Sequence, residues 1–125
     1  MSCLVIESCL LLLYFEWVMH FRKFKELHRI VRESRVHSKP SIALIRHEEL
    51  CLAMDYACVF YFKRVLCLQR SAATTLLLRR HGWNTDMVIG AQMLPFKSHA
   101  WCEINRAVVN DKPYVSEIYK DLERC

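Results

Sequence analysis

A change of hydrophobic periodicity at Gly82 constrains the fold of this chain more than any other feature. Before Gly82, apolar residues recur in long runs with helical spacing, and the clearest break is Ser38-Lys39-Pro40-Ser41. After Gly82, apolar and polar residues alternate in short runs that are typical of strands. Only two glycines and three prolines interrupt 125 residues. The sequence therefore predicts an α+β fold in which N-terminal helices pack on a small antiparallel sheet.

The spacing of apolar residues, caps and breaks predicts the individual elements. An apolar helix is expected from Cys3 to Phe21, continuing into the basic stretch that follows, and a second helix from Ile42 to about Phe62. A third helix should run from Cys67 to Arg80, because basic residues and Gly82 suit a helix C-terminus. The elements expected after it are a strand at Met87–Gly90, a hairpin of His99–Ile104 with Ala107–Asp111, and a terminal helix at Tyr114–Leu122.

The size and charge of the chain limit what it can be. Its 125 residues can bury one core. A single domain over residues 1–125 is therefore expected, mainly helical in 1–62 and made, in 63–125, of the third helix, the antiparallel strands and the short terminal helix. The net charge of +5 is modest, and the basic residues are not interleaved with aromatic ones as in nucleic-acid modules. Binding to nucleic acid is not expected.

The first helix is apolar enough to raise the question of a membrane span. Two carboxylates argue against one, because Glu7 and Glu16 are nine residues apart and so lie about 180° apart around a helix. At about 2.5 to 3.5 kcal/mol for each charge in mid-bilayer, the pair cancels much of the gain from the apolar residues. A buried or partner-facing helix is expected, and a helix lying on an anionic membrane surface is the alternative.

The cysteines do not follow a disulfide or metal-site pattern. Their count of seven is odd, no secretory leader is recognisable, and the CxxC and HExxH spacings of zinc sites are missing. A cytoplasmic, reducing location is expected, with no metal and no cofactor. The seven are Cys3, Cys9, Cys51, Cys58, Cys67, Cys102 and Cys125.

Three side chains have local settings that suit a thiol peptidase. Cys67 falls at the start of the third helix, where unpaired N–H groups and the helix dipole favour a thiolate. No acidic residue occurs between Asp55 and Asp86 to oppose it. His99 opens one strand and Asp111 closes the next. A thiolate nucleophile needs an imidazole as general base and a carboxylate to fix the imidazole tautomer, so Cys67, His99 and Asp111 are the candidate catalytic residues.

The register of the hairpin decides whether His99 and Asp111 can meet. A two-residue connection at Asn105-Arg106 would leave the two side chains on opposite faces of the sheet. A three-residue connection would pair Ile104 with Val108 and make His99 and Asp111 diagonal neighbours on one face. The second arrangement is the prediction.

Each candidate also has an ordinary structural explanation. Cys67 can be a buried core cysteine, His99 a hydrogen-bonded structural histidine, and Asp111 the N-cap of the terminal helix. Glu103 is a rival carboxylate for His99, but four residues along an extended strand place it about 13 Å away. The spacing of these residues alone does not separate a peptidase from a non-catalytic helical adaptor protein.

Five short blocks of sequence follow one another along the second half of the chain. They are Cys67–Ser71, Leu77–Gly82, Val88–Gly90, His99–Glu103 and Val109–Asp111. Together they resemble the successive motifs of the lasso peptide leader peptidases, which belong to the transglutaminase-like, papain-related superfamily. The apolar first helix and the Phe-Arg-basic stretch after it extend the resemblance over most of the chain. One departure is Cys102, where the family usually has an aliphatic residue, and this side chain is expected to point away from His99.

The resemblance implies a transglutaminase-like or papain-like cysteine peptidase core. Proteins of this family cut the leader from a ribosomally made precursor peptide, after which a separate asparagine-synthetase-like, ATP-dependent cyclase closes the macrolactam ring. Carried over residue by residue, Cys67 is the nucleophile, His99 the general base and acid, and Asp111 the orienting carboxylate. Some members also carry a leader-binding module, for which this chain has no room, so a separate small leader-recognition protein is implied as a further partner.

Some questions stay open on the sequence alone. Transglutaminase-like acyl transfer would use the same nucleophile, whereas an adaptor in a peptide-maturation or membrane-surface complex would use none of the three residues. The Cys67 backbone N–H is expected to hold part of the oxyanion, and Gln69 is a candidate second donor, although position i+2 on a helix faces another way. The first apolar helix is expected to dock the recognition protein or the cyclase.

Overall fold

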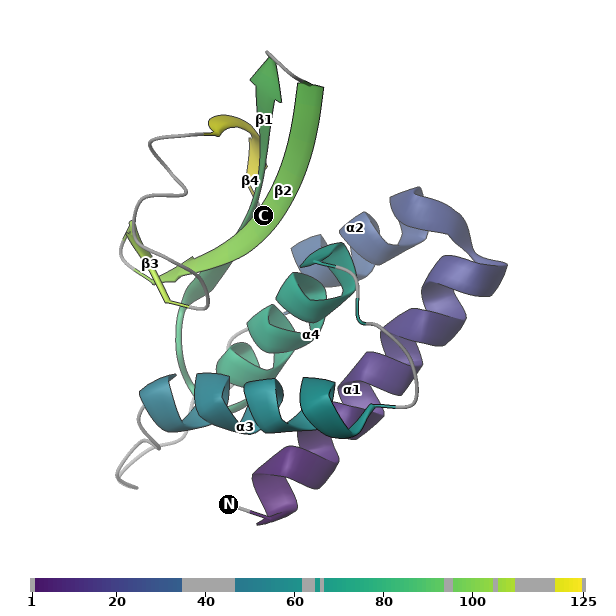
Figure 1. Ribbon diagram of the computed structural model, residues 1–125, viewed down its shortest axis with the longest axis vertical. Helices are drawn as coiled ribbons and strands as arrows, with labels where there is room; N and C mark the ends of the chain where they lie inside the picture. The colour runs from purple at the N-terminus through teal and green to yellow at the C-terminus, as the bar shows by residue number, and fades with distance from the viewer. Residues whose placement is uncertain are drawn as a thin grey trace.

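The computed structural model of the protein describes residues 2–34, 47–61, 65, 67–93, 96–104, 106–109 and 119–124. Within these ranges four helices precede four strands. They are α1 (Ser2–Phe21), α2 (Lys23–Glu33), α3 (His47–Phe60), α4 (Cys67–Arg80), β1 (Thr85–Met93), β2 (Phe96–Ile104), β3 (Ala107–Val108) and β4 (Lys120–Arg124). Figure 1 shows the helices gathered on one side of the sheet, with α4 next to β2. The predicted α+β fold is confirmed.

The sheet has the strand order β3-β2-β1-β4, and its described pairs are antiparallel. β1 runs through Gly90 to Met93, so the prediction that the strand ends at Gly90 is wrong. A Cβ on Gly90 would lie 2.6 Å from Cη2 of Trp101 on β2. Glycine at this position marks the close approach of an indole ring and not the end of the strand.

The hairpin between β2 and β3 differs from the prediction. Ile104 pairs with Ala107 and Glu103 with Val108, which is the register of a two-residue connection. Arg106 has a φ of 68°, the left-handed conformation that such a tight turn requires to match the twist of the strands. The predicted three-residue connection, which would pair Ile104 with Val108, is therefore wrong.

The C-terminal segment is also different from the prediction. Lys120–Arg124 is the strand β4, which pairs with β1, so a helix over Tyr114–Leu122 is wrong at its C-terminal end, and residues 114–118 lie outside the described ranges. The capping signals that favoured a helix are local, whereas the edge of β1 offers a row of backbone hydrogen-bonding groups to any segment that can reach it.

One apolar core joins the helices to the inner face of the sheet. Its members come from all four helices, β1 and β2, and α4 lies in the middle of it. The buried side chains are Leu12, Phe15, Val18, Leu27, Val31, Leu50, Met54, Ala57, Ala72, Ala73, Leu77, Leu78, Met87 and Ile104. Because α4 is buried on most of its surface, the helix that begins with Cys67 is a fixed element of the structure.

The two carboxylates of α1 both hold this helix against its neighbours. Glu7 accepts a hydrogen bond from Nε of Arg80 at 2.7 Å and lies 3.2 Å from Nε2 of His81, both at the end of α4. Glu16 accepts a hydrogen bond from the Tyr61 hydroxyl at 3.3 Å. This packing agrees with the expectation of a buried or partner-facing helix.

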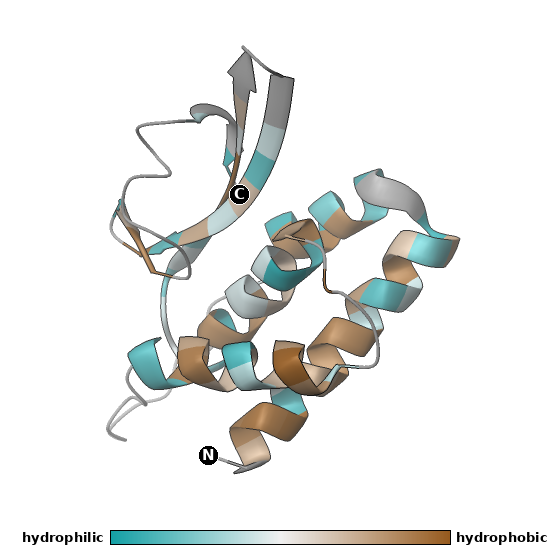
Figure 2. Ribbon diagram, viewed as in Figure 1, coloured by the Kyte–Doolittle hydropathy of each residue, from teal (hydrophilic) through white to brown (hydrophobic). Residues whose placement is uncertain are grey.

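Much of the remaining exposed surface of α1 is apolar. Its stretch Cys3–Phe21 is long and apolar enough to cross a membrane, a property that core helices and signal sequences share. Figure 2 shows hydrophobic residues along much of α1. The large apolar side chains that α1 exposes are Ile6, Leu10, Leu13, Tyr14, Trp17 and Phe21.

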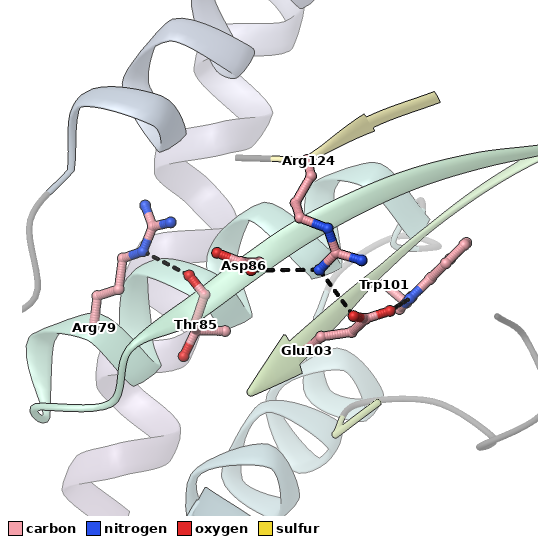
Figure 3. A network of polar contacts seen from close by, with 6 residues as sticks. All are labelled: Arg79, Thr85, Asp86, Trp101, Glu103 and Arg124. Atoms are coloured by element: carbon pink, nitrogen blue, oxygen red, sulfur yellow. Dashed lines mark hydrogen bonds and ion pairs between the residues drawn. The ribbon is translucent and has the colours of Figure 1, made fainter. Parts of the chain in front are cut away.

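A buried arginine joins the C-terminal end of α4 to α2 and β1. Arg79 is 7% exposed, and its Nε donates to the Thr85 carbonyl oxygen at 3.0 Å (Figure 3). Its Nη1 donates to the carbonyl oxygen of Val31 and, at 2.6 Å, to Oγ of Ser34. These bonds add the Arg79 guanidinium to the C-terminal end of α2, where the Val31 carbonyl oxygen also accepts from the Ser34 hydroxyl.

Candidate active site

Cys67 is the first residue of α4, as predicted, and its side chain is exposed. The first turn of a helix has backbone N–H groups without intrahelical partners, and together with the helix dipole they favour an anion. Exposure also gives a substrate access to the sulfur. The alternative in which Cys67 is a buried core cysteine is wrong.

The charge around the start of α4 is less positive than the sequence suggests. Arg70, one turn after Cys67, forms an ion pair with Asp55 of α3. The pair is solvent-exposed, with 36% and 50% of the two side chains accessible, so water and salt screen it. Among the described residues, the helix N-terminus is the main electrostatic feature beside the thiol.

Gln69 serves the fold and not the oxyanion. Its side chain is 2% exposed, and its Nε2 donates to the Leu12 carbonyl oxygen in the middle of α1 at 2.8 Å. The same nitrogen lies 3.4 Å from the hydroxyl of Tyr61. The amide that the sequence offered as a second oxyanion donor therefore ties the first turn of α4 to α1.

His99 lies on the outer face of the sheet, the face opposite α4. Its imidazole is 5.4 Å from the ring of Tyr119 and 6.1 Å from the ring of Trp101, measured between ring centroids. Cys102, three residues further along β2, lies on the inner face. Its Sγ is 3.1 Å from the Ser71 carbonyl oxygen, on α4. The predicted alternation, with His99 and Cys102 on opposite faces, is confirmed.

Burial makes Cys102 a structural cysteine. Its side chain is fully buried, and burial raises the pKa of its thiol to about 12, although a hydrogen bond with Thr75 at 3.1 Å works in the opposite direction. This thiol is therefore not a second nucleophile at neutral pH.

Cys67 and His99 lie toward the same end of the contact between α4 and β2. At the other end, Arg79 bonds to Thr85, which pairs with Ile104. Measured from the point where Ser71 contacts Cys102, Cys67 lies about 6 Å toward the N-terminal end of α4. His99 lies about 10 Å toward the N-terminal end of β2. The described ring contacts of His99 are nevertheless on the outer face, while α4 covers the inner face.

Asp111 lies outside the residues that the structure describes. The observed pairing of Glu103 with Val108 removes the argument that made Asp111 a diagonal neighbour of His99 on one face. The assignment of Asp111 as the orienting carboxylate therefore rests on the family resemblance alone.

Sequence reasoning missed the polar network on the outer face of the sheet. Glu103 Oε2 accepts a hydrogen bond from Nε1 of Trp101 at 2.7 Å, and Glu103 Oε1 accepts one from Nη1 of Arg124 at 2.8 Å (Figure 3). The alternation along β2 predicts that His99, Trp101 and Glu103 share a face, as the structure shows, but it does not predict the hydrogen bonds between them. No sequence signal indicated that β4 adds Arg124 to this network, because the segment before Arg124 was predicted to be helical. Among the described residues, no group of three or more His, Cys, Asp or Glu could hold a metal ion.

Comparison with known proteins identifies the family. Residues 9–124 match the model of the transglutaminase-like superfamily, and because this match covers nearly the whole chain, the protein belongs to that superfamily. The chain is also 32% identical over 82 residues to the microcin J25-processing protein McjB of Escherichia coli. The match covers 66% of this chain and 38% of the length of that relative. The resemblance found in the sequence is thus confirmed, and no solved structure matches.

Proposed function

We propose that the protein is a cysteine peptidase of lasso peptide maturation, which removes the leader from a ribosomally made precursor before macrolactam closure. The observation that carries the proposal is the exposed thiol of Cys67 at the N-terminus of the buried helix α4. Membership of the transglutaminase-like superfamily and the similarity to a microcin-processing protein support it. An exposed thiol at the start of a helix is accessible to a substrate carbonyl, as a cysteine nucleophile must be.

In the proposed first half-reaction, the Cys67 thiolate attacks the carbonyl carbon of the scissile bond. A carbon–sulfur bond forms, and the backbone N–H of Cys67 donates to the resulting oxyanion. His99, as the imidazolium, gives its proton to the leaving amine while the carbon–nitrogen bond breaks. The core peptide leaves with a new amino terminus, and the leader stays on the enzyme as a thioester.

In the second half-reaction, neutral His99 takes a proton from water as the water oxygen attacks the thioester carbonyl. The carbon–sulfur bond breaks, the leader leaves as a carboxylic acid, and the Cys67 thiol is regenerated. Asp111 is assigned the role of fixing the imidazole tautomer throughout. Both steps require the His99 ring, whose described contacts are with Trp101 and Tyr119 on the outer face of the sheet, to move and reach the Cys67 sulfur in the complex with substrate.

The proposal includes two further proteins and a location. A separate recognition protein would hold the leader, an asparagine-synthetase-like cyclase would consume the core peptide, and a reducing cytoplasm would keep Cys67 as a thiol. The exposed apolar face of α1, which includes Leu10 and Trp17, is the proposed docking surface for the recognition protein. Unchanged hydrogen exchange in α1 on adding that protein would reject this surface.

Precursor cleavage in the presence of the recognition protein tests the activity. Cys67→Ala should abolish the release of leader and core, and His99→Ala should lower the rate by about 10² to 10⁴-fold, the usual contribution of a general base. Cys3→Ala is the matched control, since Cys3 is another exposed cysteine, and it should cleave normally. Cleavage by Cys67→Ala at the rate of the unaltered protein would reject the peptidase and favour a non-catalytic adaptor.

Acyl transfer is the second candidate, because the superfamily is transglutaminase-like. It would share the thioester on Cys67 and differ only in the acceptor, which would be an amine in place of water. A small primary amine added to the cleavage reaction separates the two. Leader recovered as the free acid indicates hydrolysis, and leader carrying the mass of the amine indicates transfer.

A further inference from the structure

A chain of contacts on the outer face of the sheet begins at β4 and ends on His99. Arg124 of β4 lies between two carboxylates that face each other across β1 and β2, at 2.8 Å from Glu103 and 3.3 Å from Asp86. Without the guanidinium, these opposed carboxylates would repel each other. Glu103 is 3% exposed, and its second oxygen accepts the indole N–H of Trp101. Figure 3 shows both oxygens of Glu103 in use.

The indole ring that donates to Glu103 is closely packed on its other sides. Trp101 is fully buried, and its six-membered ring lies over Gly90, where a Cβ would come within 2.6 Å of Cη2 and 2.9 Å of Cζ3. The same hypothetical Cβ would lie 2.9 Å from Cβ of Tyr119. Backbone below and the Tyr119 ring 6.2 Å away therefore confine the indole.

His99 packs on this confined indole. It stands directly opposite Gly90 in the pairing of β1 with β2, and its ring is stacked on Trp101 with an interplanar angle of 27°. The Tyr119 ring approaches it at 32°. The rings of Trp101 and Tyr119 thus both restrict the orientation of the imidazole.

We propose that Glu103 and Trp101 are positioning residues for His99. Glu103 fixes the indole through its N–H, and the indole sets the plane of the imidazole, so that the buried carboxylate acts on the general base without touching it. An apolar side chain at position 103 would fill the space but leave the buried indole N–H without an acceptor. This inference rests on the proposed function, in which His99 serves Cys67.

The test follows the reaction of Cys67 with iodoacetamide across pH, read for this one cysteine by peptide mass mapping. Glu103→Gln and Trp101→Phe should slow the reaction at neutral pH by on the order of tenfold, within the loss that a 1 Å misplacement can cause, and move the pH profile toward that of His99→Ala. Asp86→Asn is the matched control, because it removes the other carboxylate of Arg124 without touching the indole, and its profile should be unchanged.

A second readout separates positioning from stability. The imidazole carbon-bound protons of His99 feel the ring currents of Trp101 and Tyr119, so their NMR resonances should move in Glu103→Gln and in Trp101→Phe. Trp101→Phe keeps an aromatic ring and leaves the ion pair with Arg124 in place, so it tests the same link if Glu103→Gln fails to fold.

One outcome of these experiments would reject the proposed function, and another would reject only the positioning role. If His99→Ala leaves the pH profile of Cys67 unchanged, His99 does not serve Cys67 and the proposed function fails. If His99→Ala changes the profile, but Glu103→Gln and Trp101→Phe leave both the profile and the His99 resonances unchanged, the peptidase stands and the positioning role is rejected.

Discussion

On the inner face of β2, Cys102 and its neighbours lie against α4, whereas on the outer face Trp101 and Glu103 lie beside Arg124 of β4. The inner face is filled mainly by small and apolar side chains, and its described polar contacts with α4 include those of the Cys102 thiol and the bond from Arg79 to the Thr85 carbonyl oxygen. On the outer face, the buried Glu103 carboxylate accepts hydrogen bonds from Trp101 and Arg124. Packing on the inner side tolerates exchange of similar volumes, while the outer side depends on specific atoms.

The two faces also differ in what they do for a candidate catalytic residue. The inner face fixes α4 and thereby the place of Cys67, which is the first residue of that helix. On the outer face, the ring of His99 packs against Trp101. One strand therefore carries two kinds of support, a general one for the candidate nucleophile and a specific one for the candidate base.

The largest effect expected from this comparison is in thiol reactivity. The pKa of about 12 for Cys102 is roughly 3 units above that of a free thiol, so its thiolate should be about 10³-fold scarcer at pH 8. Timed alkylation with peptide mapping should modify exposed Cys67 long before Cys102. Comparable alkylation rates for the two cysteines in the folded protein would show that the reagent reaches the inner face of the sheet.

A methyl group on the outer face should have a smaller effect. Gly90→Ala places its Cβ within 2.6 Å of the Trp101 ring, and this overpacking should lower the free energy of unfolding by about 1–3 kcal/mol, as measured by denaturant titration. Adding Trp101→Leu should restore part of the loss if the two residues interact. Fully additive effects of the two changes on the free energy of unfolding would contradict a contact between Gly90 and Trp101.

The smallest effect concerns an exposed ion pair remote from both faces. Burial opposes the ionisation of Glu7, but its hydrogen bonds with Arg80 and His81 outweigh burial and hold the pKa of the carboxyl below 4.5. A lowered pKa stabilises the fold above about pH 4.5, and this contribution is lost as the pH falls through the folded-state pKa.

Glu7→Gln should therefore reduce stability by less than about 1 kcal/mol at pH 7 and by a smaller amount at pH 3. Thermal unfolding at the two pH values measures the difference. Glu33→Gln, which alters an exposed carboxylate of α2, is the control. An equal loss for Glu7→Gln at both pH values would contradict the assigned ion pair.

Local signals predicted the parts of the fold that local interactions decide. The bounds of α4 followed from its basic last turn and Gly82, and the alternation of β2 gave the two faces correctly. Gly90 was misassigned because a glycine that ends a strand and one that admits a ring from the next strand look alike in sequence. The indole that distinguishes them is 11 residues away.

The errors have one physical origin, which is competition from tertiary contacts. Arg106 takes a left-handed conformation that its own propensity disfavours, and the last strand forms because β1 has an edge to pair. The position of Cys67 was predictable from helix signals, but its exposure was not. Whether Asp111 completes the site depends on a segment outside the described residues.

The bond from Gln69 to the Leu12 carbonyl oxygen has a practical consequence for protein engineering. The Cys67 thiol stands two residues before an amide whose acceptor lies in the N-terminal helix, so a fragment that starts after that helix would keep this thiol but leave the amide without its acceptor. Trimming from the amino end would remove a contact that holds the start of α4, and fusion partners are better joined without cutting into α1.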